Sequence, residues 1–232
     1  MKKFASFFAV FLFITLFAVA SEAGDRNIPV EVAQLTDSLK KQFAPDRRVA
    51  LLDIDYSFSD KNVMLRGVTT SAEAKNALLK ELARKGYAVM DCLELLPDVK
   101  GLEGKTCGII NVSVANMRVA PDFSSEMMTQ SLMGMPVRVL QRDGWVRIQT
   151  PDNYIAWVHR VGVHPVTEEE MAAWNKAEKI VVTAHYGFVY SEPNQTSQTV
   201  SDVVAGNRLK WEGSKGAFYK VTYPDGRRGY IS

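Results

Sequence analysis

The chain has 232 residues, of which 47% are hydrophobic and 23% charged, with 28 basic residues against 26 acidic ones. This length is enough for two or three small domains. The nearly balanced charge leaves no basic footprint, so the sequence excludes nucleic acid and an anionic lipid surface as expected partners.

The N-terminus has the pattern of a secretory signal peptide. Met1-Lys2-Lys3 precedes an apolar run over 4–20, and small residues follow as far as Ala23. A basic start, an apolar middle and a small-residue exit predict a cleaved signal peptide over 1–23. A membrane anchor is the alternative, because a run of this length is near the lower limit for spanning. We therefore expect a periplasmic or extracellular protein with no membrane span after cleavage.

Residues 27–99 are predicted to form a small α+β domain. Apolar residues spaced by four indicate a helix over 28–44, and apolar runs indicate strands over 49–56 and 63–68. The segment between these strands has turn chemistry. The order of elements therefore begins as helix, strand, strand.

A second helix and a third strand complete this domain. Thr70 and Glu73 have the spacing of a capping box, which predicts that a helix begins there, and Gly86 is suited to end it. The run over 87–96 then reads as a strand, and the polar stretch over 99–106 reads as a linker.

The second strand of this domain carries a short family motif. Leu65-Arg66-Gly67-Val68, followed by a helix with paired alanines and a closing strand, resembles a BON-type domain. Because such domains are associated with envelope and lipid-surface binding, the resemblance implies an envelope role for 27–99. A spacer that packs against its neighbour is the alternative.

After residue 106 the apolar periodicity changes to two. Short alternating runs separated by turn residues predict several closely spaced strands. They lie at 109–114, 136–140, 145–149 and 154–158. Many short strands with little room for helices predict a small barrel or sandwich.

The same half of the chain contains an internal repeat with a period of about 72 residues. Its matched pairs are Pro121 and Pro193, Gly134 and Gly206, Trp145 and Phe218, Pro151 and Pro224, and Trp157 and Tyr230. The repeat predicts two copies of one β module, over 107–163 and 178–232, and the second copy could be truncated. A helical linker over 164–177 joins them, and Thr167 and Glu170 form its capping box.

The first copy resembles a bacterial SH3-like domain. The matching residues are Asn116, Arg118, Pro121, Gly134, Gly144, Trp145 and Trp157. The second copy departs at its start, where Phe188 and Tyr190 replace the Asn and the Arg. The resemblance implies a mainly β fold, with two tandem SH3-like β-barrels after the small α+β N-terminal domain.

The whole arrangement resembles the N-terminal region of exported NlpC-type cell-wall cysteine endopeptidases similar to γ-D-glutamyl dipeptidyl-peptidases, which trim muropeptides. Ser113-Val114-Ala115-Asn116 and Tyr190-Ser191-Glu192-Pro193 are among the segments that carry it. In that family a catalytic domain with one Cys and two His follows the second module. No such domain lies before Ser232, so no catalytic residue is assigned.

A site for peptidoglycan peptides needs aromatic walls, a carboxylate for an amine and a donor for a carboxylate. Tyr186, Tyr190 and Glu192 in the second copy, with Arg118 in the first, are the candidate ligand-binding residues. In the alternative, the tyrosines are wall residues and Glu192 belongs to a turn. Arg118 would then pack its stem over the barrel and bind a turn carbonyl. Trp145 and Trp157 are expected in the core or half-core.

Cys92 and Cys107 are the only two cysteines. In an oxidising compartment they could form a disulfide, and two buried free thiols are the alternative. The histidines at 159, 164 and 185 have no metal-ligand spacing. We therefore expect neither a metal nor another cofactor.

Together these features predict an exported non-catalytic binding protein whose tandem modules recognise peptidoglycan or its peptides. An alternative is the targeting portion of a cell-wall γ-D-glutamyl cysteine peptidase whose catalytic domain lies beyond Ser232. A structural module that docks protein partners is a third possibility.

Overall fold

The computed structural model describes residues 28–232. Backbone contacts divide the chain into two compact units with their boundary between Leu95 and Leu96, and each unit is considered by itself. The predicted signal peptide over 1–23 lies outside the described residues. Within 28–232, no helix combines the length and the apolar character needed to cross a membrane.

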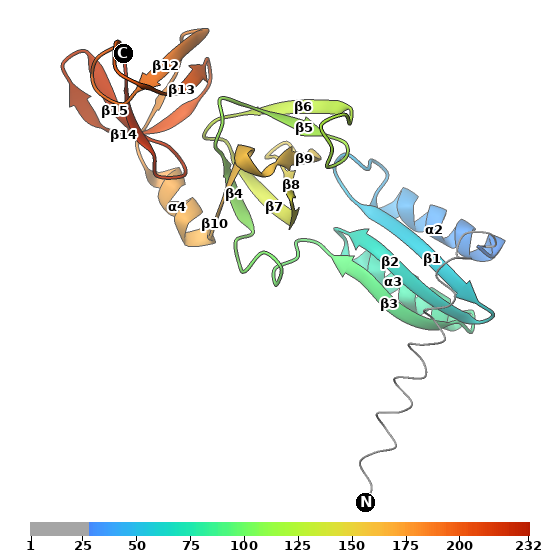
Figure 1. The fold of residues 1–232 in the computed structure, drawn as a ribbon. Helices are drawn as coiled ribbons and strands as arrows, with labels where there is room; N and C mark the ends of the chain where they lie inside the picture. Colours follow the sequence, from blue (N-terminus) through green and yellow to red (C-terminus); the bar gives the residue numbers. More distant parts are fainter. Residues whose placement is uncertain (1–27) are drawn as a thin grey trace, which may run out of the picture. The chain divides into compact units, whose positions relative to one another are not determined.

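The first unit is a three-stranded sheet with two helices packed against it (Figure 1). Its elements are α2 (Val30–Phe43), β1 (Leu52–Ser59), β2 (Asn62–Thr69), α3 (Ala72–Arg84) and β3 (Ala88–Leu95). β1 pairs antiparallel with β2, and β2 pairs parallel with β3 across the α3 crossover. The predicted order of elements is confirmed, although the first strand begins three residues later than its apolar run.

The start of α3 differs from the predicted capping box. Ser71, not Thr70, is the N-cap, and its hydroxyl accepts from the Ala74 N–H at 3.0 Å. The Thr70 hydroxyl instead accepts from the Leu51 N–H, so it is engaged with the segment before β1. The prediction of a capping box formed by Thr70 and Glu73 is therefore wrong. The N-cap of the helix lies one residue later than predicted.

The second unit begins with a seven-stranded sheet that forms the first module. Its strands are β4 (Cys107–Ile110), β5 (Val114–Arg118), β6 (Met127–Leu132), β7 (Pro136–Asp143), β8 (Trp145–Gln149), β9 (Ile155–His159) and β10 (Val163–Val166). The strand order is β10-β4-β7-β8-β9-β5-β6. The expected single strand over 109–114 is two strands, since the chain bends at 111–113. The stretch predicted as a polar linker packs Leu102, 4% exposed, into this module's core.

The second module repeats the architecture of β4 to β9. Its strands are β11 (Lys179–Val181), β12 (Tyr186–Tyr190), β13 (Thr199–Val204), β14 (Arg208–Lys215), β15 (Phe218–Thr222) and β16 (Arg228–Ile231), in the order β11-β14-β15-β16-β12-β13. Register shifts recur at matched places, between Met117 and Arg118 and between Val189 and Tyr190. The internal repeat is therefore confirmed in three dimensions.

Each module wraps its sheet around its own hydrophobic core. Neither sheet is a closed ring of paired strands. Within 28–232, no pairing joins β10 to β6 or β11 to β13. Each core draws residues from most strands of its own sheet, because bulges let the sheet bend around them. The prediction of two SH3-like folds holds, while barrels closed by strand pairing are not found.

Helix α4 (Glu168–Lys176) follows β10 and begins at the predicted capping box. Thr167 accepts from the Glu170 N–H, and the Glu170 carboxylate accepts from the Thr167 N–H. The helix buries Met171 and Trp174 against Ile109 of β4. The connection between the modules is therefore a packed element of the first module.

The two modules are joined at the turn that contains Met133 and Gly134. The Met133 side chain comes from the first module, is 1% exposed and packs in the core of the second. The Met133 carbonyl accepts from the Arg208 N–H at 3.0 Å, and the Gly134 carbonyl accepts from the Trp174 indole N–H at 3.2 Å. Gly134 has φ +83, and a Cβ there would lie 2.3 Å from the Arg208 carbonyl oxygen.

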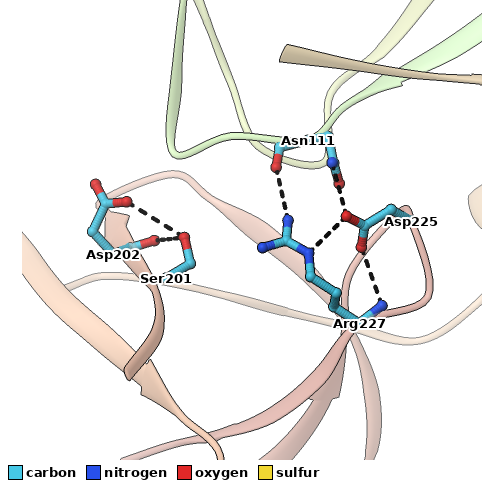
Figure 2. Close-up of polar contacts among 5 residues, drawn as sticks. All are labelled: Asn111, Ser201, Asp202, Asp225 and Arg227. Carbon is cyan, nitrogen blue, oxygen red and sulfur yellow. Dashed lines mark hydrogen bonds and ion pairs between the residues drawn. The ribbon is translucent and has the colours of Figure 1, made fainter. Parts of the chain in front are cut away.

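Polar side chains extend the contact between the modules (Figure 2). Asp225 accepts from the Asn111 side-chain amide at 3.0 Å and from the Arg227 guanidinium at 2.6 Å. Burial opposes ionisation of Asp225, but these hydrogen bonds outweigh it and lower the pKa of the carboxyl. The Ser113 hydroxyl donates to Asp202 at 2.6 Å, and Figure 2 shows that Asp202 also accepts from its neighbour Ser201. These charge-assisted hydrogen bonds therefore hold the two modules in a defined position relative to each other.

Gly134→Ala is expected to destabilise the second unit by about 3 kcal/mol, since it adds a backbone clash to the strain of a positive φ. Gly144→Ala is the matched control, because Gly144 also has a positive φ but open space around the added Cβ. The control substitution should lower the free energy of unfolding by about 1 kcal/mol. All four tryptophans lie after residue 144, so urea unfolding followed by tryptophan fluorescence reports on this unit alone. Equal losses for both variants would contradict the close approach.

Both cysteines are free thiols in the structure, and they lie in different units. Cys92 is exposed, whereas Cys107 is partly buried. Burial, with a smaller contribution from the charge of Glu168, raises the pKa of the Cys107 thiol.

Iodoacetamide at pH 8 is therefore expected to alkylate Cys92 about tenfold faster than Cys107, because the thiolate is the reactive form and Cys107 is less accessible. Peptide mass spectrometry of the unreduced protein measures both rates. Failure of both cysteines to react until a reductant is added would show that they form a disulfide.

Candidate functional site: matched grooves on the two modules

A groove of about 330 Å³ lies on the second module. The strand β12 supplies one wall, because period-two alternation places Tyr186, Phe188 and Tyr190 on the same face. Val189 points to the opposite face and is fully buried. Residues 180–184 supply another wall. The groove also includes Gln195, Tyr219 and Ser232.

The aromatic side chains of β12 form a continuous row. The Tyr186 and Phe188 ring centroids are 5.0 Å apart at 78°, and those of Phe188 and Tyr190 are 6.4 Å apart at 58°. Tyr186 is 60% exposed and Phe188 37%. Rings held edge to face in this way keep their conformation while they present apolar surface to solvent. The row can therefore bind a ligand by stacking and apolar contact.

Two of the predicted site residues, Tyr186 and Tyr190, line this groove together, whereas Glu192 is not among its lining residues. Glu192 is exposed and lies in the turn after β12. Its N–H donates to the Ser197 hydroxyl, and its carbonyl accepts from the Asn194 N–H at 2.7 Å. The structure therefore places Glu192 in a turn and does not bring it together with the tyrosines.

Phe188 is the groove residue that the sequence interpretation did not include among the candidates. In the repeat it stands at the position of Asn116, where the second copy departs from the SH3-like motif. Its spacing of two from Tyr186 and from Tyr190 was the available signal, since alternating positions in a strand share a face.

The first module has a smaller groove of about 190 Å³ at the matched position, and Arg118 lines it. The Arg118 guanidinium donates to the Ser125 carbonyl at 2.5 Å and so holds the turn that follows β5. Asp122 in that turn accepts from the backbone and hydroxyl of Ser124, which lowers the pKa of its carboxyl. Asn116 accepts from the Gln130 amide across the strand pair. The Asn-x-Arg motif therefore shapes this turn and groove.

Three packed rings occupy one end of the first groove. Phe123 lies 4.9 Å from Trp145 and 5.1 Å from His159 between ring centroids, and Trp145 lies 5.3 Å from His159. In the second module, the repeat places Gln195, Phe218 and Ser232 at these positions. The cluster of three rings in the first copy is therefore reduced to one ring, Phe218, in the second. Trp157, 8% exposed, is a core residue as expected.

The groove on the second module offers rings, phenol hydroxyls, an amide and a hydroxyl. These groups can stack against a ligand and form hydrogen bonds with it. Among residues 28–232, no group of three or more His, Cys, Asp or Glu side chains is placed to hold a metal ion.

Two solved structures are similar to part of this chain. Among solved structures, an NlpC/P60 family protein from Bacillus cereus is 20% identical, with a TM-score of 0.45 over 54% of this chain and 53% of that one. An NlpC/P60 endopeptidase from Photobacterium damselae subsp. piscicida is 15% identical, with a TM-score of 0.42 over 59% of this chain and 33% of that one. The match thus spans about half or less of those proteins.

A comparison with curated proteins found no match. Residues 117–161 match the model of the bacterial dipeptidyl-peptidase SH3 domain, and residues 185–232 match that of the bacterial SH3 domain. The chain therefore carries two tandem SH3 domains of the bacterial kind, the first of them of the dipeptidyl-peptidase type.

Proposed function

We propose that this protein is an exported, non-catalytic binding protein of the cell envelope that recognises peptidoglycan peptides through its SH3 modules. The observation that carries the proposal is the exposed row of Tyr186, Phe188 and Tyr190 along an open groove. Bacterial SH3 domains typically bind cell-wall components, and the second module matches this class over 185–232.

The chemistry of the groove fits a short peptide with small aliphatic side chains. Stem peptides of peptidoglycan offer methyl groups, amide planes and carboxylates. The aromatic row can pack against the methyl groups and amide planes, while the Gln195 amide and the Ser232 hydroxyl can donate to carbonyl or carboxylate oxygens. Aromatic contacts of this kind contribute about 0.5–1.5 kcal/mol each beyond burial, so one groove alone gives weak binding.

The junction between the modules explains how weak sites can give useful retention. Met133 and the Asn111–Asp225 contact hold the two modules in one arrangement. A polymer with many repeats of the same peptide can engage both grooves at once, and the second contact then benefits from a high effective concentration. The Arg118 groove of the first module is the second site in this proposal.

The match of residues 117–161 to the dipeptidyl-peptidase SH3 domain favours a second candidate function. The chain would be the targeting portion of a cell-wall γ-D-glutamyl cysteine peptidase. The coding sequence after Ser232 tests this directly. An in-frame extension with one Cys and two His supports the peptidase, and a stop codon contradicts it.

Phe188→Ala combined with Tyr190→Ala is expected to lower retention on purified sacculi about tenfold, because the groove loses its apolar wall. Trp211→Ala is the matched control, since Trp211 is an exposed aromatic residue of the same module that does not line the groove. Co-sedimentation across a range of sacculus concentrations measures the effect. Unchanged retention of the double variant, or an equal loss for the Trp211 control, would contradict the proposal.

A further inference from the structure

The groove of the first module differs from that of the second in the charge of its lining. It contains Arg118, whose charge is permanent, and His159, and within 28–232 no Asp or Glu lines it. At the matched positions the second module has Tyr190 and Ser232, and none of the described residues that line its groove is charged. A cationic side chain is therefore a property of the first groove and not of the shared fold.

The turn after β5 forms in the same way in both modules, although only the first has an arginine beside it. The Ala120 N–H donates to the Ser125 hydroxyl, and the same bond recurs between their counterparts in the second module. The backbone hydrogen bond that closes the turn also recurs. The second module forms these bonds with Tyr190 at the position of Arg118. The turn itself therefore does not require a guanidinium.

Asp122 is the acid within this turn, and its carboxylate is engaged by the turn. It accepts from the Ser124 N–H at 2.7 Å and from the Ser124 hydroxyl at 2.9 Å. In the second module, the neutral Asn194 accepts the same two bonds from Thr196. The position thus needs an acceptor and not a charge. Within 28–232, Arg118 forms no ion pair with Asp122 or with another carboxylate.

The polar groups that line the first groove are mainly hydrogen-bond donors. The guanidinium of Arg118 has five N–H groups, of which one donates to the Ser125 carbonyl. The Asn116 side-chain oxygen accepts from the Gln130 amide at 2.8 Å, which leaves the Asn116 amide nitrogen as a donor. The imidazole of His159 adds another N–H. A lining rich in donors and without a carboxylate fits a ligand that brings anionic oxygens.

The size and walls of the groove indicate what carries these oxygens. Its volume of about 190 Å³ is below the range of about 300–1,000 Å³ for pockets that enclose a drug-sized ligand. Three packed rings stand at one end of it. Its apolar walls carry methyl groups and come from Val112, Val114, Val158 and Val161. The groove therefore suits the last residue of a chain, with a small aliphatic side chain, better than a chain that passes through.

We propose that the groove of the first module binds the C-terminal carboxylate of a peptidoglycan stem peptide. The guanidinium of Arg118 donates to the carboxylate, and the valine walls enclose the methyl group of a terminal alanine. Charge-assisted bonds of this kind are about twice as strong as neutral ones. This inference rests on the proposed function and names the part of the ligand that the first module recognises.

Two synthetic stem pentapeptides test the proposal, one with a free C-terminal D-alanine and one whose C-terminus is an amide. NMR titration of the ¹⁵N-labelled full chain measures both, and the amide signals of 112–118 report on the first groove. The acid is expected to bind about tenfold more tightly, because the amide cannot form the charge-assisted pair. Equal binding in this groove overturns the inference and leaves the proposed function standing. Binding of neither peptide anywhere on the chain contradicts both.

A stem peptide also has a carboxylate within the chain, on its glutamate residue. A third peptide, with this internal group amidated and the C-terminus free, distinguishes the two sources. It should bind to the first groove as tightly as the unmodified acid. A loss of affinity that follows the internal carboxylate overturns the assignment to the chain end.

Arg118→Gln tests the side chain itself, because glutamine retains an amide donor and loses the charge. Binding of the acid should weaken about tenfold, while binding of the amide should not change. Equal weakening of both peptides would indicate a purely structural role and would overturn the proposal. Arg138→Gln is the matched control, since Arg138 is an exposed arginine of β7 that does not line the groove. This control should bind both peptides as the unmodified protein does.

The side-chain Nε–H signal of Arg118 gives a second readout if Arg118→Gln does not fold. In the unmodified protein this signal should shift when the acid is added and should stay in place with the amide. An unchanged signal at saturating acid, or equal shifts with both peptides, overturns the proposal.

Discussion

The insertion of the Met133–Gly134 turn into the second module is the contact on which the arrangement of both SH3 modules depends. One methionine of the first module completes the core of the second, and the next residue must be glycine because a backbone carbonyl lies where its Cβ would be. Around this turn, the Trp174 indole and the Asp225 carboxylate add directional bonds. Each module alone would be a small domain of marginal stability. This contact joins the first module to the hydrophobic core of the second.

The sequence predicted most of the fold, because the features that determine it are local or periodic. The repeat, the Thr167–Glu170 capping box and the turn glycines required only spacing and residue type. The role of Met133 could not be predicted, since nothing in a methionine-rich stretch indicates which methionine enters a neighbouring core. The bend at 111–113 was missed because the apolar alternation continues through it. The strand β6 was missed because its side chains on both faces are polar or flexible.

Part of the candidate site was also predicted, again because it depends on a periodic pattern. Alternation placed Tyr186 and Tyr190 together, and the structure adds Phe188 between them. The charge of Glu192 predicted a role in the site, but this residue belongs to the turn after β12 and does not line the groove. The two copies line the same groove differently: Arg118 and three packed rings line the first, and the aromatic row of β12 lines the second. Divergence within a repeat is therefore more informative about binding than its shared residues, which mainly maintain the fold.

The central claim is that the open groove of the second module is a binding site for a peptidoglycan peptide. Titration of the ¹⁵N-labelled protein with a soluble muropeptide, followed by NMR, tests it most directly. The account predicts saturable amide shifts that are largest at 186–190, Gln195 and Ser232, with smaller shifts near Arg118. Absence of shifts at saturating muropeptide, or shifts centred on the first unit, would contradict it.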